Sequence, residues 1–496
     1  MTAREWQHAL YFRDRWTPNA RLTLDLGLRW ELYPIMHRAD GRGIDRLDLA
    51  NPVFARQLDV IIAGRGGNPQ NNGMDTSLNN FAPRLGGVYR INDLTVFRSG
   101  YGLTYNAQPW ARPMRGHNDY PVTIASTFVN SEAFAPYATL QQGIPKILGP
   151  DLSSGRVPLD LAAGFNTPEL GNLDRGYVHT WNIAVERMLP FNATVEVAYV
   201  GAKGVGGYAG LDINAPQTLG VGDAGRPYAS LGRLQPIYLW GDRLATRYNS
   251  LQGALNKRMT RGLAFKGAYT LAKAMNESCN DGDGAATLCF NTPGELWRNW
   301  GPAGFDRRHN LQLGVIYAVP WRTEDRAGGF GKALASDWQI NGVLGAFSGN
   351  PFTMIANGGS LNTPSNNAGN TANANLADLV GTYNITNNVG SDGTWFDTSA
   401  FAQPTGVRFG NTTRNEFYGP GGWNLDLSVF RGFPVGAQRK LEARFEVGNL
   451  FNRGIFANPQ NNVTSGTFGV ITAVANNNGA AFYPERQIRL GLRFSF

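Results

Sequence analysis

Two stretches near the end of the chain decide the fold: KLEARFEV at residues 440–447 and ERQIRLGLRFSF at residues 485–496. In the first stretch every second residue is apolar, namely Leu441, Ala443, Phe445 and Val447. The second stretch repeats the pattern with Ile488, Leu490, Leu492, Phe494 and Phe496. Because the side chains of a strand point alternately to its two faces, each stretch predicts a strand with one apolar and one charged face.

The charged faces of these two strands carry both signs, and the chain stops on an aromatic residue inside the last strand. A soluble sheet can alternate in the same way. A membrane-spanning barrel turns its apolar face to lipid and its polar face to the lumen, and it places aromatic residues at the water interface. We therefore predict an all-β fold, a transmembrane antiparallel up-and-down β-barrel of the outer membrane, with Phe494 and Phe496 as its C-terminal aromatic signature.

Composition excludes several other classes of protein. Hydrophobic residues make up 42% of the 496-residue chain and the mean hydropathy is −0.29, with no long unbroken apolar run. A helical membrane protein is therefore excluded, since each spanning helix needs about 20 mostly apolar residues. The net charge of +8 comes from Arg and Lys residues scattered singly, so we expect no nucleic-acid binding. The chain contains no HxxxH motif, His/Cys cluster or nucleophile elbow, so we expect neither an enzyme nor a cofactor.

The alternating pattern predicts thirteen strands, joined by connections that are alternately short and long. Their ranges are 5–16, 21–33, 81–91, 94–106, 177–189, 193–203, 248–259, 263–275, 307–319, 335–348, 422–433, 439–450 and 485–496. A turn is expected at 17–19, and the segments 34–80, 107–175 and 204–247 are expected to be loops. A further short strand is expected within 468–474. Short periplasmic turns that alternate with long extracellular loops are typical of bacterial barrels.

Charged residues on the predicted inner face are the first group of candidate site residues. They contact a plug, line a solute path, or form a solvated wall of charges paired across strands. The residues are Arg21, Asp25, Arg29, Glu31, Glu442, Arg444, Glu446, Arg489 and Arg493. Aromatic residues near the predicted strand ends are interpreted as interface girdles, although some of them could stack on a sugar or chelate. They are Trp6, Trp16, Trp30, Tyr33, Trp181, Trp321, Trp338 and Trp423.

Cys279 and Cys289 are the only cysteines, and they fall in one predicted extracellular loop. Their even number in an oxidising compartment predicts a local disulfide, with two buried free thiols as the alternative. The sequence NDGDG at 280–284 is similar to part of a calcium loop but lacks the later ligands, so a flexible turn is the preferred interpretation. Asp306-Arg307-Arg308-His309 predicts a hydrogen-bonded network at the barrel rim rather than a metal or catalytic site.

Longer motifs spread over nearly the whole chain carry a family resemblance. They are RLTLDLGLRWE (21–31), NNFAPRLGGVYR (79–90), RSGYGLTYN (98–106), TWNIAVERMLP (180–190), YNSLQGALNKRM (248–259), GAYTLAKAMN (267–276), FDRRHNLQLGVIYAVPW (305–321), TWFDTSAFAQP (394–404), RFGNTTRNEFYGPGGWNLDLSVFRGFPV (408–435) and EVGNLFNRGIFANPQNNVTSGTFGVITA (446–473). With these motifs in this order, the chain resembles the C-terminal barrel of TonB-dependent outer-membrane receptors, most closely the Oar-like group.

The resemblance implies a barrel of ~22 strands that an internal plug occludes. In the family the plug precedes the barrel, as does the short box that the energy-transducing partner grips, and neither is found here. The opening MTAREWQHALYF also lacks a signal peptide. Single-chain bacterial barrels have an even number of strands, whereas thirteen is odd. We therefore expect residues 1–496 to be a partial TonB-dependent receptor-like barrel domain, the C-terminal part of a larger barrel from a Gram-negative bacterium.

The resemblance also implies partners and a function. The partners are outer-membrane lipid, the barrel-assembly machinery and, for the full-length family, the TonB energy-transducing complex. The function is energy-coupled uptake of a scarce solute such as a metal chelate, an oligosaccharide or a peptide. The alternatives are an Oar-like surface protein that serves adhesion or secretion, and a passive porin. Specificity would lie in loops with no readable code, so the sequence does not name the substrate.

Overall fold

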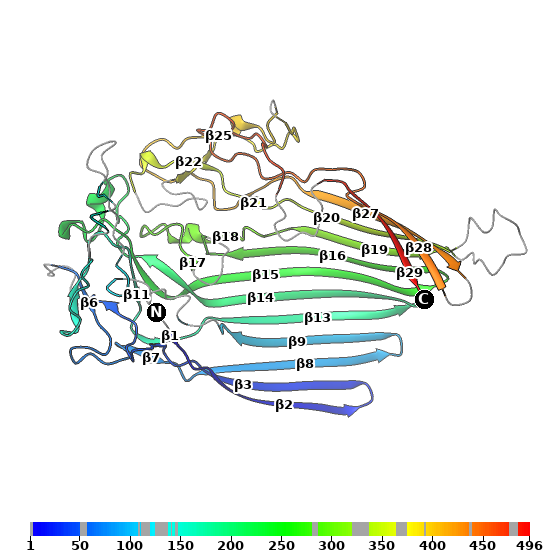
Figure 1. Cartoon of the computed structure of the whole chain (residues 1–496), viewed down its shortest axis with the longest axis horizontal. Coiled ribbons are helices and arrows are strands. Elements are labelled where there is room, and N and C mark those ends of the chain that lie inside the picture. The colour runs from blue at the N-terminus through cyan, green and yellow to red at the C-terminus, as the bar shows by residue number, and fades with distance from the viewer. Residues whose placement is uncertain are drawn as a thin grey trace, which may run out of the picture.

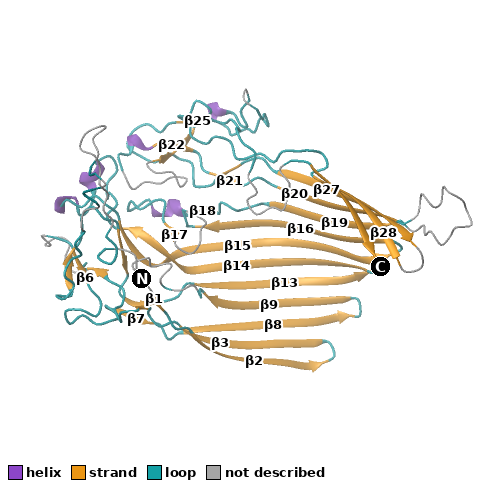
Figure 2. Cartoon of the chain, viewed as in Figure 1, coloured by secondary structure: helices purple, strands orange, loops and turns teal. Residues whose placement is uncertain are grey.

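The computed structural model shows one large antiparallel sheet with folded loops gathered mainly at one end (Figures 1 and 2). It describes residues 3–49, 57–107, 110, 120–124, 137–139, 141–143, 147–279, 286–319, 337–363, 374–390, 393–435, 439–475 and 485–496. The long strands are β2 (His8–Asn19), β3 (Leu22–Leu32), β8 (Asn80–Asn92), β9 (Thr95–Tyr105), β13 (Tyr177–Leu189), β14 (Ala193–Asp212), β15 (Ile237–Thr260), β16 (Leu263–Asn276), β19 (His309–Ala318), β20 (Trp338–Phe347), β27 (Gly422–Val435), β28 (Arg439–Gly448) and β29 (Gln487–Ser495). The predicted all-β fold class is confirmed.

Each of these thirteen strands pairs with the next one along the chain, and every such pair is antiparallel. The sheet therefore has the up-and-down topology of consecutive hairpins. Tight turns join strands on the right of Figure 1, whereas most of the loops gather on the left and top. In the turn from β15 to β16, Gly262 has a φ of 80°, and a Cβ there would lie 2.1 Å from the carbonyl oxygen of Ala318. Only glycine fits this turn without strain.

Short elements occupy the loop layer, the described residues that connect the long strands at the end opposite the tight turns. The short strands are β1 (Ala3–Arg4), β4 (His37–Arg38), β5 (Arg46–Leu47), β6 (Asp59–Ile61), β7 (Met74–Thr76), β10 (Arg156–Pro158), β11 (Phe165–Pro168), β12 (Gly171–Leu173), β17 (Ala286–Thr287), β18 (Gly301–Pro302), β21 (Pro351–Phe352), β22 (Ile355–Asn357), β23 (Ala374–Leu376), β24 (Asp378–Leu379), β25 (Phe401–Ala402) and β26 (Phe417–Tyr418). Single 3₁₀ turns are η1 (Gly222–Gly225), η2 (Ala229–Leu231), η3 (Leu296–Asn299), η4 (Gly358–Ser360) and η6 (Thr398–Ala400).

Three sequence-based predictions of local structure are wrong. The predicted turn at 17–19 is part of β2, where the pairing register shifts between Trp16 and Asn19. Pro18 is tolerated there because it lies within this register shift, where it has no partner in the ladder with β3. The predicted loop at 204–247 is strand at both ends, because β14 and β15 extend into it. Glycines in the extension of β14 conceal the alternation there. The predicted strand within 468–474 is absent, with only a single bridge from Val474 to Phe456.

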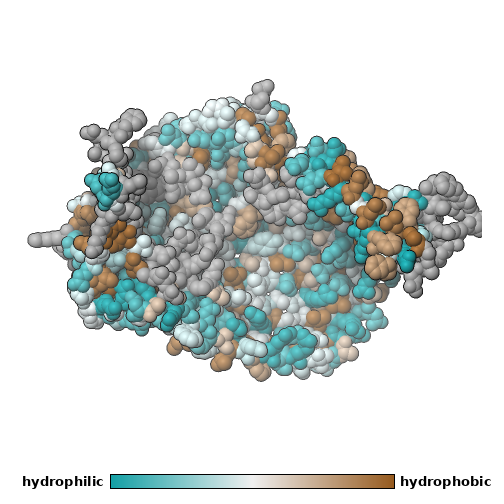
Figure 3. Space-filling view, in the orientation of Figure 1, coloured by the Kyte–Doolittle hydropathy of each residue, from teal (hydrophilic) through white to brown (hydrophobic). Residues whose placement is uncertain are grey.

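The two faces of the sheet differ as the alternation predicts. Directly opposed residues share a face, so the register links Phe445 to Leu490 and Val447 to Ile488 across β28 and β29. The apolar face is strongly exposed, with 80% of Leu490 accessible. In a bilayer this face contacts lipid, whereas the opposite face lines the lumen. Figure 3 shows one side of the molecule hollowed at its centre, where hydrophilic and neutral residues dominate.

The buried apolar clusters belong largely to the loop layer. One cluster joins Leu47 and Val60 to Val157, Phe165 and Ile237, from three stretches far apart in sequence. Others gather around Phe290 and around Phe396. The segments predicted as featureless loops are therefore folded together around hydrophobic cores of their own. Within the described residues, no helix has the length and apolarity needed to cross a membrane.

The face assignment predicts opposite sensitivities for two neighbouring residues of β29. Leu490→Arg places a charge on the lipid face and should cost about 2–4 kcal/mol if the residue lies near the bilayer midplane. Arg489→Leu changes the lumenal face and should cost less. The measurement is the yield of folded protein in the outer-membrane fraction. Equal yields of the two variants would contradict the assignment.

Candidate functional site

The lumenal face of the first strands carries a set of linked charges. Asp25 on β3 accepts hydrogen bonds from Arg13 Nη2 at 2.9 Å and from Arg15 Nε at 3.1 Å, both on β2. Arg29 forms an ion pair with Glu31, whose second oxygen accepts a hydrogen bond from the hydroxyl of Tyr33 at 2.8 Å. The predicted charges Asp25, Arg29 and Glu31 therefore lie on one face of β3. Asp25 pairs with arginines of β2, whereas Arg29 and Glu31 pair with each other.

Arg21 lies outside this wall. It sits in the turn between β2 and β3, where its backbone N–H and that of Leu22 donate to Asn19 Oδ1 at 2.9 and 3.0 Å. The side chain of Asn19 thus closes the turn. Because Arg21 lies one residue before β3, it is at the tip of the hairpin and not among the charges of the lumen.

The predicted charges of the last two strands lie opposite one another across the β28–β29 register. Glu442 is opposed to Arg493, and Glu446 is opposed to Arg489. Within β28, Glu442 pairs with Arg444 at 2.7 Å, and Lys440 lies 3.6 Å from the same carboxylate. This arrangement mixes both signs along the wall, as expected for charges that face water inside a barrel.

Three lumenal charges that sequence reasoning did not single out form a cross-strand cluster. Arg98 on β9 contacts Glu186 on β13 at 3.0 Å and Glu196 on β14 at 3.2 Å. The two glutamates are directly opposed in the register, so the arginine bridges two like charges. The sequence did contain a signal for this cluster, because all three residues fall on the inward-facing positions of their predicted strands.

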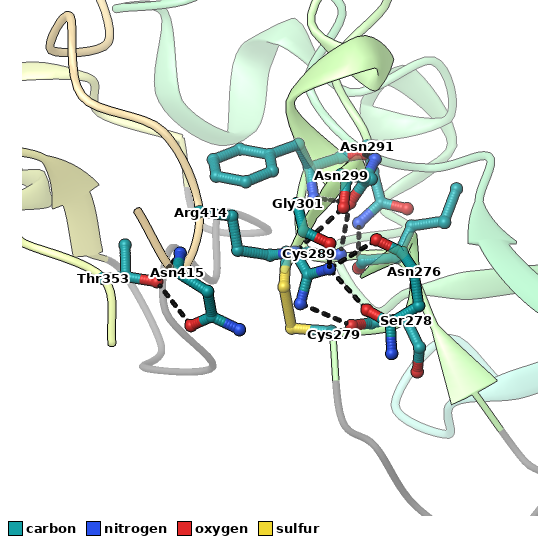
Figure 4. Close-up of a disulfide and its surroundings, with 12 residues drawn as sticks. Asn276, Ser278, Cys279, Cys289, Asn291, Asn299, Gly301, Thr353, Arg414 and Asn415 are labelled. Atoms are coloured by element: carbon teal, nitrogen blue, oxygen red, sulfur yellow. Dashed lines mark hydrogen bonds between the residues drawn. A yellow bond between two sulfur atoms is a disulfide. The ribbon is translucent and has the colours of Figure 1, made fainter. Parts of the chain in front are cut away.

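In the structure Cys279 and Cys289 form a disulfide, and Cys289 is fully buried beside Phe290 (Figure 4). The segment NDGDG between them lies outside the described residues, as does Trp321. Burial of Cys289 against the loop cluster shows that the disulfide belongs to the packed part of the loop layer. The sulfur atoms therefore link the end of β16 to the core of the following loop.

Arg414 is the hydrogen-bond centre of this part of the loop layer, and sequence reasoning missed it. Its side chain is 2% exposed and donates to the backbone carbonyls of Asn276, Ser278, Asn299 and Gly301 (Figure 4). All four acceptors lie more than one hundred residues earlier in the chain. A long-range hub of this kind has no local signature, because only the folded loops bring the carbonyls together.

Arg175 is a second buried hub, at the start of the loop layer. Its guanidinium lies 4.1 Å from the ring centre of Tyr33 and 3.9 Å from that of Trp110. It also pairs with Glu5 at 2.9 Å. Burial lowers the pKa of Arg175, while Glu5 opposes this effect. Tyr33, predicted as a girdle residue, is therefore a buried stacking partner instead.

The predicted Asp306–Arg–His network does not form as one unit. Asp306 accepts hydrogen bonds from Tyr418 Oη at 2.7 Å and from the N–H of Ala274 at 2.6 Å. His309 instead pairs with the hydroxyl of Tyr269 at 2.7 Å. Burial, followed by the hydrogen bond to Asp306, raises the pKa of Tyr418. Arg308 also contacts Tyr418, with its guanidinium 5.4 Å from the ring centre, whereas His309, the first residue of β19, lies apart.

Other predicted girdle residues lie near strand ends. Trp16 and Trp338 are near the tight turns, and Trp30, Trp181 and Trp423 are nearer the loop layer. Trp6 lies just before β2 and is 67% exposed. Among the described residues, no group of three His, Cys, Asp or Glu side chains has the arrangement needed to hold a metal ion. The site is thus a charged wall below a folded loop layer.

Comparison with known proteins identifies one family. The model described as "Outer membrane beta barrel domain" matches residues 1–489. No curated protein sequence matches the chain. Similar solved structures include the pyoverdine receptor FpvA of Pseudomonas aeruginosa PAO1 bound to pyoverdine, with 12% identity, a TM-score of 0.44, and coverage of 100% of this chain and 42% of that chain.

Two further structures give similar values. The siderophore receptor PiuA of Acinetobacter baumannii shows 9% identity and a TM-score of 0.43, with 99% of this chain and 43% of that chain covered. The FrpB iron transporter of Neisseria meningitidis shows 10% identity and a TM-score of 0.41, with coverage of 98% and 44%. The chain spans less than half the length of each of these three proteins.

The hub at Arg414 predicts a large local effect of one substitution. Arg414→Gln leaves buried carbonyls without donors, which costs about 1–3 kcal/mol for each one that water cannot reach. We expect new cleavage by a protease added outside cells that display the protein, within the segments 276–302 and 408–419. The control is Arg65→Gln, since Arg65 is exposed and donates to the carbonyl of Gly64. Equal protease resistance in both variants would show that Arg414 does not hold these loops together.

Proposed function

The chain belongs to the outer membrane beta barrel domain family, and on this premise we propose that it forms part of the barrel of a TonB-dependent receptor. The protein resides in the outer membrane. The receptor would import a scarce solute, such as a metal chelate, an oligosaccharide or a peptide, with energy from an inner-membrane partner. Within this proposal the closest subgroup is the Oar-like one, on the sequence motifs quoted above.

The observation that carries the proposal is the combination of a lipid-facing sheet, a charged lumenal wall and a folded loop layer. A receptor needs all three, because the loops capture the solute, the wall conducts it and the sheet anchors both. The clusters around Phe290 and Phe396 give the loop layer a core. Loops with a core can hold a binding surface in one shape, as a receptor requires.

The open edges of the sheet support a larger barrel. Among the described residues, β2 and β29 end the row of strands, and neither has a partner on its outer side. An unpaired strand edge is not viable in hydrocarbon, since each free backbone group there costs several kcal/mol. We propose that further strands close the barrel and that a plug fills it, so that residues 1–496 are one part of the domain.

The larger-barrel proposal predicts the size of the native protein. The intact mass of the polypeptide in the native outer-membrane fraction should lie well above the 54.0 kDa of this chain. Mass spectrometry of the purified protein measures it directly. A mass near 54.0 kDa would mean that the sheet must close by association of several copies, and the proposed receptor architecture would be wrong.

The uptake proposal predicts an energy-dependent growth phenotype. Deletion of the gene should abolish growth when one scarce solute is the sole source of a nutrient, and inactivation of the energy-transducing partner should do the same. Growth on a panel of ferric chelates, oligosaccharides and peptides identifies the solute. Uptake that persists without the energy-transducing partner would favour a porin. Loss of attachment or secretion without a growth defect would favour the adhesion alternative.

A further inference from the structure

The lumenal wall contains a hollow beside the edge of the sheet, formed by β2, β3 and β8. Its volume is about 570 Å³. We call it the arginine hollow. It is lined by Tyr11, Arg13, Asp25, Gly27, Arg29, Arg84 and Gly86, which share the lumenal face, and also by Phe12, Leu26, Leu28 and Leu85, which alternate with them along the strands. A space of this size suits a small molecule rather than a single ion.

The hollow exists because glycines alternate with arginines across the sheet. Arg13 on β2 is opposed to Gly27 on β3, which is opposed to Arg84 on β8 and then to Gly102 on β9. Strands lie about 4.8 Å apart, so the backbones at the two arginines are about 10 Å apart with no side chain between them. A Cβ built on Gly27 would lie 3.6 Å from the Cβ of Arg84, so a larger residue there would enter the hollow.

The charges around the hollow do not balance. Four arginines, Arg13, Arg15, Arg29 and Arg84, face two carboxylates, Asp25 and Glu31, which leaves an excess of two positive charges. Arg13 and Arg15 share the single carboxylate of Asp25. Arg84 has no ion pair among the described residues. A charge excess at a built hollow favours an anionic occupant.

The other lumenal clusters of charged residues can be compared with the arginine hollow in their net charge. Around Arg98 two glutamates surround one arginine, so that cluster carries the opposite sign. On β28, Glu442 has two basic neighbours, Lys440 and Arg444, and the adjoining register opposes the glutamates to arginines of β29. The arginine hollow differs from both clusters in that glycines on the same face leave space between its charged side chains.

We propose that the arginine hollow binds a small polyanionic solute that carries two or more carboxylate or phosphate groups. Guanidinium groups present paired donors that match the oxygens of such groups, and Arg13 and Arg84 flank the space from both sides. Tyr11 adds an aromatic ring and a hydroxyl at the same place. That this anion is also the imported solute rests on the proposed uptake function. Binding of the anion to the hollow does not depend on that function.

Binding of pyrophosphate and of citrate to the native protein, purified from outer membranes in detergent, tests the proposal by calorimetry. Arg84→Gln should weaken binding of both anions at least about tenfold, because it removes charge-assisted hydrogen bonds. Gly27→Val should weaken binding by filling the hollow without changing any charge. The matched control is Arg90→Gln, on the same face of the same strand but outside the hollow, and it should leave affinity unchanged.

Several outcomes overturn the proposal. One is the absence of binding to the unchanged chain, and another is equal weakening by Arg84→Gln and Arg90→Gln, which would reveal only a diffuse positive potential. Unchanged affinity in Gly27→Val would show that the anion binds elsewhere. Retained anion binding without any uptake phenotype would count against the proposed function alone.

Discussion

A backbone N–H or C=O group without a hydrogen bond costs several kcal/mol in the hydrocarbon of a bilayer, and the architecture of this chain follows from that constraint. Thirteen consecutive strands satisfy it by pairing each with the next, in antiparallel register along the whole row. Short turns at one end keep neighbouring strands adjacent, so most irregular backbone gathers beyond the other end. Among the described residues the outer sides of β2 and β29 are the unpaired edges of this row, and under the proposed architecture further strands pair there.

With the backbone fixed, the side chains divide the sheet into two environments. Every second residue faces lipid and most of these residues are apolar, as along β29, while the alternate residues meet water in the lumen. Charges on the lumenal side stay near partners on the same or adjacent strands, such as Asp25 with Arg13 and Arg98 with Glu186. Glycines on this side, including Gly27, open space between long side chains. The wall is therefore both a support for the barrel and a surface with local differences in charge.

Sequence alone predicted what depends on neighbours in the chain. The thirteen strands and their two faces follow from a local period of two, and Tyr177–Leu189 agrees with the structure at both ends. The loop layer could not be predicted in this way, because its contacts join distant segments. Arg414 reaches carbonyls more than one hundred residues away, and Arg175 reaches Glu5 across 170 residues. Glycines in β14 hid a strand extension, because a residue without a side chain shows no preference for either face.

The central claim is that one face of the sheet meets lipid and the other meets water, and spin labels along β29 test it most directly. Single cysteines at residues 487–495 can be labelled in turn, since Cys279 and Cys289 are joined to each other. After reconstitution in a bilayer, collision rates with oxygen and with a water-soluble nickel chelate should alternate with a period of two. Labels at 488, 490, 492 and 494 should favour oxygen, and those between them the chelate. Rates without alternation would contradict the membrane-spanning sheet.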